Sequence, residues 1–205
     1  MRFNNPFEAI EAEVDMALPP TVNQALPHQV LQRLNMLFQP GSLGLVVILR
    51  GVPGIGKSTL AKKIRTWCLE NDMTCVICNA DIWMMRANGY NWDPNQLVHA
   101  HNHCKGRFVL AMAAETDVIV IDNTNLHRAH YEWYVNHLDV ENYEVQCIEI
   151  DCQNLDAARL ASARSHVRLR NNRNNNDDTE TRQRNITRTL YDRFEADRDV
   201  QHPRD

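Results

Sequence analysis

The sequence predicts an α/β fold in which a parallel sheet of about four strands is flanked by helices. Three observations support this fold class. Apolar runs rich in valine and isoleucine recur along the chain, they end in glycine or polar residues, and the segments between them show helical spacing. Strands that alternate with helices build parallel sheets through right-handed crossovers. At 205 residues and 43% hydrophobic, the chain can bury one good core.

The first 40 residues differ from the rest because prolines divide them into short pieces, at Pro6, Pro19, Pro20, Pro27 and Pro40. Between the last two prolines, apolar residues from Val30 to Leu37 follow helical spacing. We therefore expect residues 1–40 to be a partly helical N-terminal extension whose helix packs on the main domain. Residues 41–205 are expected to form that domain.

The main domain begins with "GLVVILR" (44–50), a continuous apolar run typical of a strand buried on both faces. The helix that follows has Leu60, Ile64 and Trp67 on one face. Further expected strands are 73–79, 117–122 and 143–150, and further expected helices are 96–115 and about 127–138. The remainder, 153–198, is expected to form two helices interrupted by an Asn-rich polar stretch.

Directly after the first strand comes "GVPGIGKS" (51–58), which fits the phosphate-loop pattern G-x-x-x-x-G-K-[ST]. Glycines allow the backbone to curl so that successive N–H groups face a phosphate, and the following helix adds its N-terminal dipole. The motif therefore predicts ATP and Mg²⁺ as ligands, with the Ser58 hydroxyl on the metal. The residues expected to hold the nucleotide are Gly51, Pro53, Gly54, Ile55, Gly56, Lys57, Ser58 and Thr59.

Two acids follow other strands of the expected sheet. Asp122 ends the run "VIVI", and in this topology it would lie near the metal. The alternative, a helix N-cap, suits Asn125 better than Asp122. Asp81 follows the second strand by two residues, at the edge where open α/β sheets bind ligands. It is the candidate general base of a phosphoryl transfer, and the alternative is a solvated loop acid or helix cap.

The combination of "GVPGIGKST" (51–59), Asp81 and "DNTNL" (122–126) resembles the polynucleotide 5′-kinase family of P-loop kinases. The resemblance covers roughly residues 44–196. It implies a kinase-type P-loop NTPase fold in which Lys57 binds the donor phosphates and Asp81 deprotonates a 5′-hydroxyl. "YNWDP" (90–94), followed by His101 and Cys104, resembles a subgroup of such domains found in larger RNA-processing proteins.

By the same resemblance, Thr124 and Asn125 would lie against acceptor or donor phosphates. A helical lid at about 161–182 would bring Arg164 onto the nucleotide, with Arg168, Arg170 and Arg173 as further candidates. The chain departs from the family pattern three residues after the base, where Met84 replaces an arginine of some members. Arg86 would have to substitute for it on the acceptor, and His101 would face the acceptor pocket.

Three functions remain open at this point. The first is phosphorylation of single-stranded or end-frayed 5′-hydroxyl RNA or DNA, the second is a zeta-toxin-like kinase of a small-molecule hydroxyl, and the third is a nucleotide-binding adaptor. The third would recruit a protein partner through residues 1–40. A net charge of −4 and a pI near 6.1 argue against a protein that coats duplex nucleic acid.

Weaker signals in the sequence bear on the cellular location of the protein and on zinc binding. No apolar run is long enough to span a membrane and no signal peptide is visible, so we expect an intracellular, cytoplasmic protein, with the nucleus left open. Cys75 and Cys78 form a C-x-x-C, and His99 and His103 share a helix face, which are minor candidates for zinc. Reduced thiols in a core are the favoured alternative.

Overall fold

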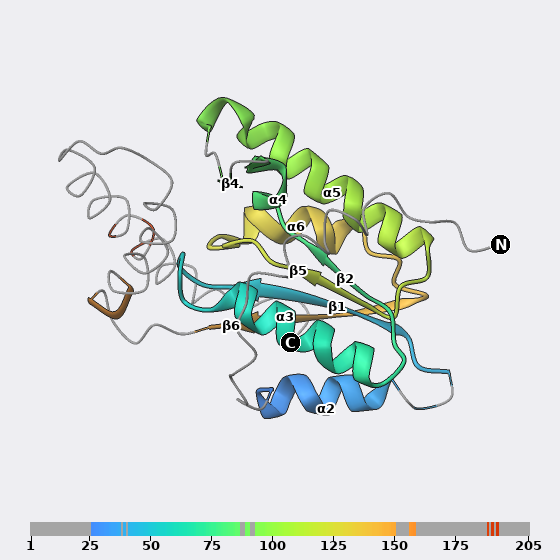
Figure 1. The fold of residues 1–205 in the computed structure, drawn as a ribbon. Coiled ribbons are helices and arrows are strands. Elements are labelled where there is room, and N and C mark those ends of the chain that lie inside the picture. Colours follow the sequence, from blue (N-terminus) through green and yellow to red (C-terminus); the bar gives the residue numbers. More distant parts are fainter. Residues whose placement is uncertain are drawn as a thin grey trace.

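The computed structural model describes residues 26–37, 39, 41–86, 89–90, 93–150, 156–158, 188, 190 and 192. Its centre is a four-stranded parallel sheet in the order β2-β5-β1-β6 (Figure 1). The α/β class and the four-stranded parallel sheet are therefore confirmed. The strands are β1 (Gly44–Arg50), β2 (Cys75–Cys78), β5 (Val118–Ile121) and β6 (Tyr143–Glu149).

Helices cover both faces of this sheet (Figure 1). On one face lie α2 (His28–Met36) and α3 (Lys57–Glu70), and on the other lie α5 (Leu97–Ala113) and α6 (Arg128–Asn136). Each strand of the central pair alternates its side chains between the two faces. Ile48 and Ile121 thus point towards α5 and α6, whereas Val47 and Val120 point towards α2 and α3.

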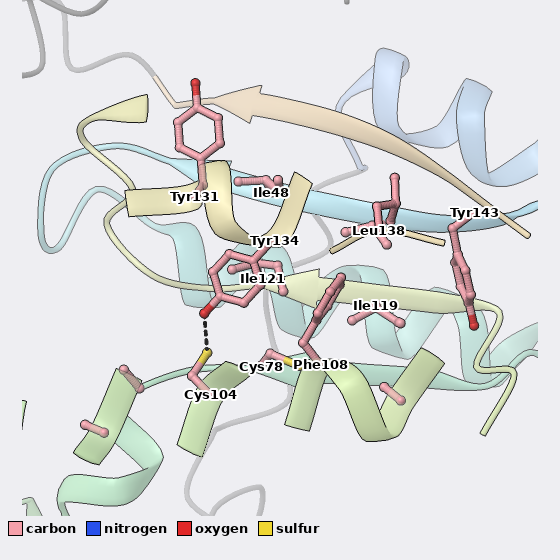
Figure 2. Close-up of a cluster of buried hydrophobic side chains, with 14 of the residues drawn as sticks. Ile48, Cys78, Cys104, Phe108, Ile119, Ile121, Tyr131, Tyr134, Leu138 and Tyr143 are labelled. Carbon is pink, nitrogen blue, oxygen red and sulfur yellow. Dashed lines mark hydrogen bonds between the residues drawn. The ribbon is translucent and has the colours of Figure 1, made fainter. Parts of the chain in front are cut away.

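The two cores differ in composition. The α2/α3 side is aliphatic, with Val30, Leu34, Leu60 and Ile64 packed on the sheet. The α5/α6 side contains aromatic rings and buried polar contacts, one of which is drawn in Figure 2. There the hydroxyl of Tyr134 donates a hydrogen bond of 3.2 Å to the Cys104 Sγ, and Phe108 meets the Tyr134 ring edge-on at 5.3 Å.

Up to residue 150, the expected strands and helices agree with the structure to within a few residues. Of the two helices expected at 153–198, the structure describes residues 156–158, 188, 190 and 192 alone. The strand expected at 73–79 is limited to Cys75–Cys78, and the helix expected at 96–115 is α5, preceded by a short 3₁₀ turn, η1 (Pro94–Gln96). The helix expected around Val30 is α2, and Val30 and Leu34 are fully buried against the sheet. No helix of the described residues is long and apolar enough to cross a membrane.

No helix or strand was predicted between Asp81 and residue 96, yet this segment contains regular structure. It contains a helical turn, α4 (Asp81–Met84), and an antiparallel pair formed by β3 (Met85–Arg86) and β4 (Gly89–Tyr90). The N-cap residue of α6 is His127, whose side chain makes no capping hydrogen bond, so the alternative of a helix cap holds for neither Asp122 nor Asn125. The lid expected at 161–182, with Arg164, lies outside the described residues.

Candidate nucleotide and metal site

Three loops meet at the carboxyl edge of the sheet because their strands are neighbours. Strand β5 pairs in parallel with β1 on one side and with β2 on the other. The phosphate loop, the DNTN segment and the turn that carries Asp81 therefore leave the sheet side by side. This is the edge at which open α/β sheets bind ligands.

The phosphate loop (51–58) depends on glycine at two positions. Gly51 has φ +148, and a Cβ there would lie 3.0 Å from the main-chain oxygen of Ile150. Gly56 has φ +114 and occupies the N-cap position of α3. Helix α3 thus begins directly at Lys57, where the first-turn N–H groups have no intrahelical acceptors and the positive end of the dipole faces the loop. This arrangement suits a phosphate group.

Lys57 lies inside the phosphate loop. Its Nζ donates hydrogen bonds to the carbonyl oxygens of Gly51 at 2.8 Å and Val52 at 2.9 Å, and the residue is 7% exposed. Burial lowers the pKa of Lys57 to about 8, while the carboxylates of Asp122 and Asp81 oppose that shift. The ammonium group therefore lies close enough to both acids to be influenced by their charges.

Asp122 is buried at the end of β5 and has one carboxylate oxygen without a partner. Its Oδ2 accepts a hydrogen bond of 2.9 Å from Asn79 Nδ2, whereas Oδ1 is buried and makes no hydrogen bond. Burial raises the pKa of Asp122, and hydrogen bonds from Ser58 and Asn79 oppose the shift. A buried carboxylate oxygen without a donor is costly unless a cation binds it.

These donors fit Mg²⁺. The Oδ1 of Asp122 and the nearby Ser58 hydroxyl are hard oxygen ligands, and Mg²⁺ commonly takes only one or two protein ligands beside waters and substrate phosphates. Ser58 is the second residue of α3 and is exposed. The two residues expected to hold the metal are therefore brought together by β5 and the start of α3.

Asp81 is exposed at the start of α4, and a neighbouring amide fixes its backbone. Its main-chain N–H donates to Asn79 Oδ1 at 2.6 Å. The Asn79 side chain also donates a hydrogen bond from its Nδ2 group to Asp122. The sequence analysis missed Asn79, although an amide two residues before the candidate base in "CNAD" was a visible signal.

The DNTN segment (122–126) is held by Arg50, a second residue that the sequence analysis missed. Arg50 is 1% exposed, and its guanidinium donates to the carbonyl oxygens of Asn125 at 3.1 Å and Leu126 at 3.2 Å. It also pairs with Glu149 at 3.2 Å. An arginine closing the apolar strand "GLVVILR" was the signal. The planar guanidinium group of arginine has five N–H donors, so it can bind several acceptors at once.

The residues expected to bind the acceptor occupy different environments. Thr124 is half-buried, and its carbonyl oxygen accepts a hydrogen bond of 3.0 Å from the N–H of Gly51. Asn125 is 1% exposed at φ +48, with Nδ2 donating to the Leu49 carbonyl oxygen at 2.8 Å. Its amide therefore shapes the loop, and its contact with a substrate stays a prediction. Arg86 lies in β3.

His101 is exposed on α5, close enough to Asp81 to be influenced by its charge. Partial burial and the charge of Lys105 lower the pKa of His101, and the Asp81 carboxylate opposes this shift. His99 and His103 instead contact the Trp83 ring, with centroids 6.5 Å and 5.2 Å away. The histidines of α5 and Trp83 of α4 therefore lie near Asp81, the candidate base.

The minor zinc candidates do not form a cluster among the described residues. No three His, Cys, Asp or Glu side chains within the part of the chain that the structure describes lie close enough to hold a metal ion together. Cys75 and Cys78 lie on opposite sides of β2, one packed against each core. Within this part of the chain the cysteines are reduced.

Comparison with known proteins identifies the family. Residues 46–196 match the family model described as AAA domain. The chain is 35% identical over 104 residues to human NEDD4-binding protein 2, a match that spans 50% of this chain and 6% of that protein.

The fold also matches a solved structure. A chain in the structure of the Pnkp1/Rnl/Hen1 RNA repair complex superposes with a TM-score of 0.57 at 13% identity, over 80% of this chain and 48% of that one. At this identity the likeness shows a shared fold. The match to the family model covers well over half of the sequence, including the phosphate loop, Asp81 and Asp122. The chain therefore belongs to the AAA domain family, with the P-loop kinase-like architecture described above.

Proposed function

We propose that this protein is an ATP-dependent kinase that transfers the γ-phosphate to the 5′-hydroxyl of a polynucleotide. The observation that carries the proposal is the convergence of two carboxylates on Lys57. Asp122 and Asp81 come from different strand ends, and both raise the pKa of this lysine against the effect of burial. A nucleotide-binding adaptor needs the lysine and the metal ligand, but it has no use for the second acid.

Each group has a role that matches its position. Lys57 and the N–H groups at the start of α3 neutralise the donor phosphates, and Asp122 and Ser58 hold Mg²⁺, which supplies further positive charge to them. Asp81 accepts the proton of the 5′-hydroxyl. The hydroxyl oxygen then forms a bond to the γ-phosphorus as the bond to the bridging oxygen breaks, and ADP leaves with that electron pair.

The acceptor would approach over α4 and α5, beside Asp81. His101 lies there on α5, and Thr124 lies at the entrance of the DNTN segment. Arg86 and Arg164 are proposed to bind acceptor and donor phosphates, respectively, because a guanidinium matches phosphate oxygens with two parallel hydrogen bonds. Asn125 would contribute through the shape of the loop that its side chain maintains.

A nucleic-acid acceptor is favoured over a small molecule by the DNTN segment and by the shared fold with a chain of an RNA repair complex. Eleven of the eighteen arginines follow residue 150, so we expect the basic side chains that contact the nucleic acid to come mainly from this part of the sequence. With a net charge of −4, the protein would contact only a few phosphates, so we expect single-stranded or end-frayed substrates and salt-sensitive binding.

The test is transfer of label from γ-labelled ATP to 5′-hydroxyl RNA and DNA oligonucleotides in the presence of Mg²⁺. We expect labelling by the natural protein and a loss of about 10²–10⁴-fold in Asp81→Asn, because the amide cannot accept the proton. The matched control is Asp72→Asn, an exposed acid beyond the far end of α3. This control should label at the natural rate.

Two results would contradict the proposal. ATP binding without labelling of any oligonucleotide would exclude a polynucleotide acceptor, and small-molecule hydroxyls would then be tested in the same assay. Full activity of Asp81→Asn would exclude this carboxylate as the base. If neither oligonucleotides nor small hydroxyls are labelled while ATP still binds, the adaptor role takes the place of the kinase.

A further inference from the structure

Asn79 lies between the two acids of the site and contacts both. It follows β2 directly, and its side chain uses both ends of the amide. The Nδ2 group donates to Asp122 Oδ2 at 2.9 Å, and the Oδ1 atom accepts from the main-chain N–H of Asp81 at 2.6 Å. One planar group therefore joins the candidate base to the candidate metal ligand.

The two contacts have different consequences for the two acids. Because Nδ2 occupies Oδ2 of Asp122, the carboxylate is oriented with Oδ1 left for a cation. Because Oδ1 of Asn79 holds the N–H of Asp81, the first residue of α4 is fixed relative to that carboxylate. A side-chain amide can make both contacts because it has a donor for the Asp122 carboxylate and an acceptor for the main-chain N–H of Asp81.

We propose that Asn79 is a positioning residue that sets the distance and orientation between Asp81 and the Mg²⁺ ligand Asp122. The part of this inference that concerns Asp81 rests on the proposed function, in which Asp81 is the base. The part that concerns Asp122 rests on Mg²⁺ binding alone and holds whatever the acceptor is. Partners of this kind, which orient a metal ligand without touching the metal, affect metal binding and rate strongly when they are removed.

Other contacts hold the two strand ends together without Asn79. The main-chain N–H of Ala80 donates to Asn123 Oδ1 at 3.0 Å, and the N–H of Asp122 donates to the Cys78 carbonyl oxygen at 2.9 Å. Asn123 is in turn anchored by a hydrogen bond of 3.4 Å from Nδ2 to the Cys104 Sγ. Loss of the Asn79 side chain should therefore leave the loops folded while the two acids lose their fixed relation.

The experiment compares Asn79→Ala and Asn79→Asp with the natural protein. Asn79→Ala removes both contacts, whereas Asn79→Asp keeps an acceptor for the N–H of Asp81 and loses the donor to Asp122. The matched controls are Asn136→Ala and Asn136→Asp, at an exposed position that ends α6 away from the site. The readouts are kcat and KM for oligonucleotide labelling, the melting temperature, and ATP affinity by calorimetry with and without Mg²⁺.

We expect Asn79→Ala to lower kcat by about 10–100-fold, and to weaken the gain in ATP affinity that Mg²⁺ provides by a similar factor. The KM for the oligonucleotide, the ATP affinity without Mg²⁺ and the melting temperature should stay close to those of the natural protein. Asn79→Asp should lose the Mg²⁺ effect as well. The Asn136 variants should change none of these quantities.

Three results would overturn the inference. The first is a natural kcat together with a natural Mg²⁺ effect in Asn79→Ala. The second is a parallel loss of melting temperature and of Mg²⁺-free ATP binding, which would give Asn79 a purely structural role. The third is a natural Mg²⁺ effect in Asn79→Asp. If the natural protein labels no oligonucleotide, the proposed function fails separately, since calorimetry needs no acceptor and still decides the role at Asp122.

Discussion

The phosphate loop (51–58) and the DNTN segment (122–126) follow neighbouring strands, yet they are built by different means. The phosphate loop takes its shape from glycines with positive φ and presents main-chain N–H groups, with Lys57 as its one basic side chain. The DNTN segment is shaped by side chains, with Arg50 and the Asn125 amide as internal braces. The first is local in sequence, whereas the second depends on Leu49 and Arg50 of β1, which lie far away along the chain.

This difference predicts how each region responds to substitution. A change at Lys57 should affect ligand binding and catalysis more than folding, because its ammonium group contacts main-chain oxygens of the loop itself, whereas Val52 and Ile55 pack in a hydrophobic cluster. A change at the braces of the DNTN segment should affect folding first.

Lys57→Met should give the largest effect. Removing a cation that stabilises the transferring phosphoryl group is expected to lower the rate by about 10²–10³-fold. The folded state should be retained, because the apolar chain removes the cost of burying a charge, and this gain offsets the loss of the hydrogen bonds that Nζ donates to the Gly51 and Val52 carbonyl oxygens. The labelling assay and a urea denaturation curve measure the two quantities. A marked loss of stability in this variant would contradict the separation between the two regions.

Arg50→Met should act on folding. It leaves the carbonyl oxygens of Asn125 and Leu126 inside the protein without their donor, which is expected to cost roughly 2–4 kcal/mol of unfolding free energy. Urea denaturation measures this value. The control is Arg33→Met, because Arg33 and its partner Glu144 are both about half exposed and that pair should contribute less than about 1 kcal/mol. Equal losses in the two variants would show that Arg50 does not brace the segment.

The phosphate loop could be predicted from the sequence because its chemistry is contained in eight consecutive residues. The motif fixes the glycines, the lysine and the start of α3, and the apolar runs on either side fix the strands. The sheet and the start of α3 were confirmed by the structure. The order of the strands was not predicted, and the structure supplies it: β5 lies beside β1, which brings the end of "VIVI" next to the phosphate loop.

The braces could not be predicted, because each joins residues far apart in the chain. Arg50 meets Glu149, and Asn79 meets Asp122, through the pairing of parallel strands. The pair β3–β4 was missed for a different reason: two-residue strands carry no alternating pattern. The residue type of Asn125 suits a helix cap, which was the alternative considered for this segment, but in the structure Asn125 lies at φ +48 and its side chain donates to the Leu49 carbonyl oxygen.

The pH dependence of ATP binding should reflect Lys57. Its pKa of about 8 lies below the usual value for lysine because the side chain is buried, with Asp122 and Asp81 opposing the shift. Above pH 8 the free protein loses the positive charge that the phosphates require, so the affinity for ATP should fall, by at most about tenfold per pH unit. Calorimetry at pH 7 and pH 9 measures the change. The Lys57→Met variant should show no such slope, and a slope that persists in it would assign the effect to another group.

Tyr134→Phe should give the smallest effect and refine the comparison. The lost hydrogen bond from the Tyr134 hydroxyl to the Cys104 Sγ is expected to cost about 1 kcal/mol of unfolding free energy. Cys104 keeps its contact with Asn123, so the rate of labelling should not change. The control is Tyr143→Phe, which loses a hydroxyl contact of 2.9 Å to the Thr116 carbonyl oxygen before β5 begins. If Tyr134→Phe lowers kcat while Tyr143→Phe does not, the aromatic core reaches the DNTN segment through Cys104 and Asn123, and the two kinds of region are coupled more closely than their contacts indicate.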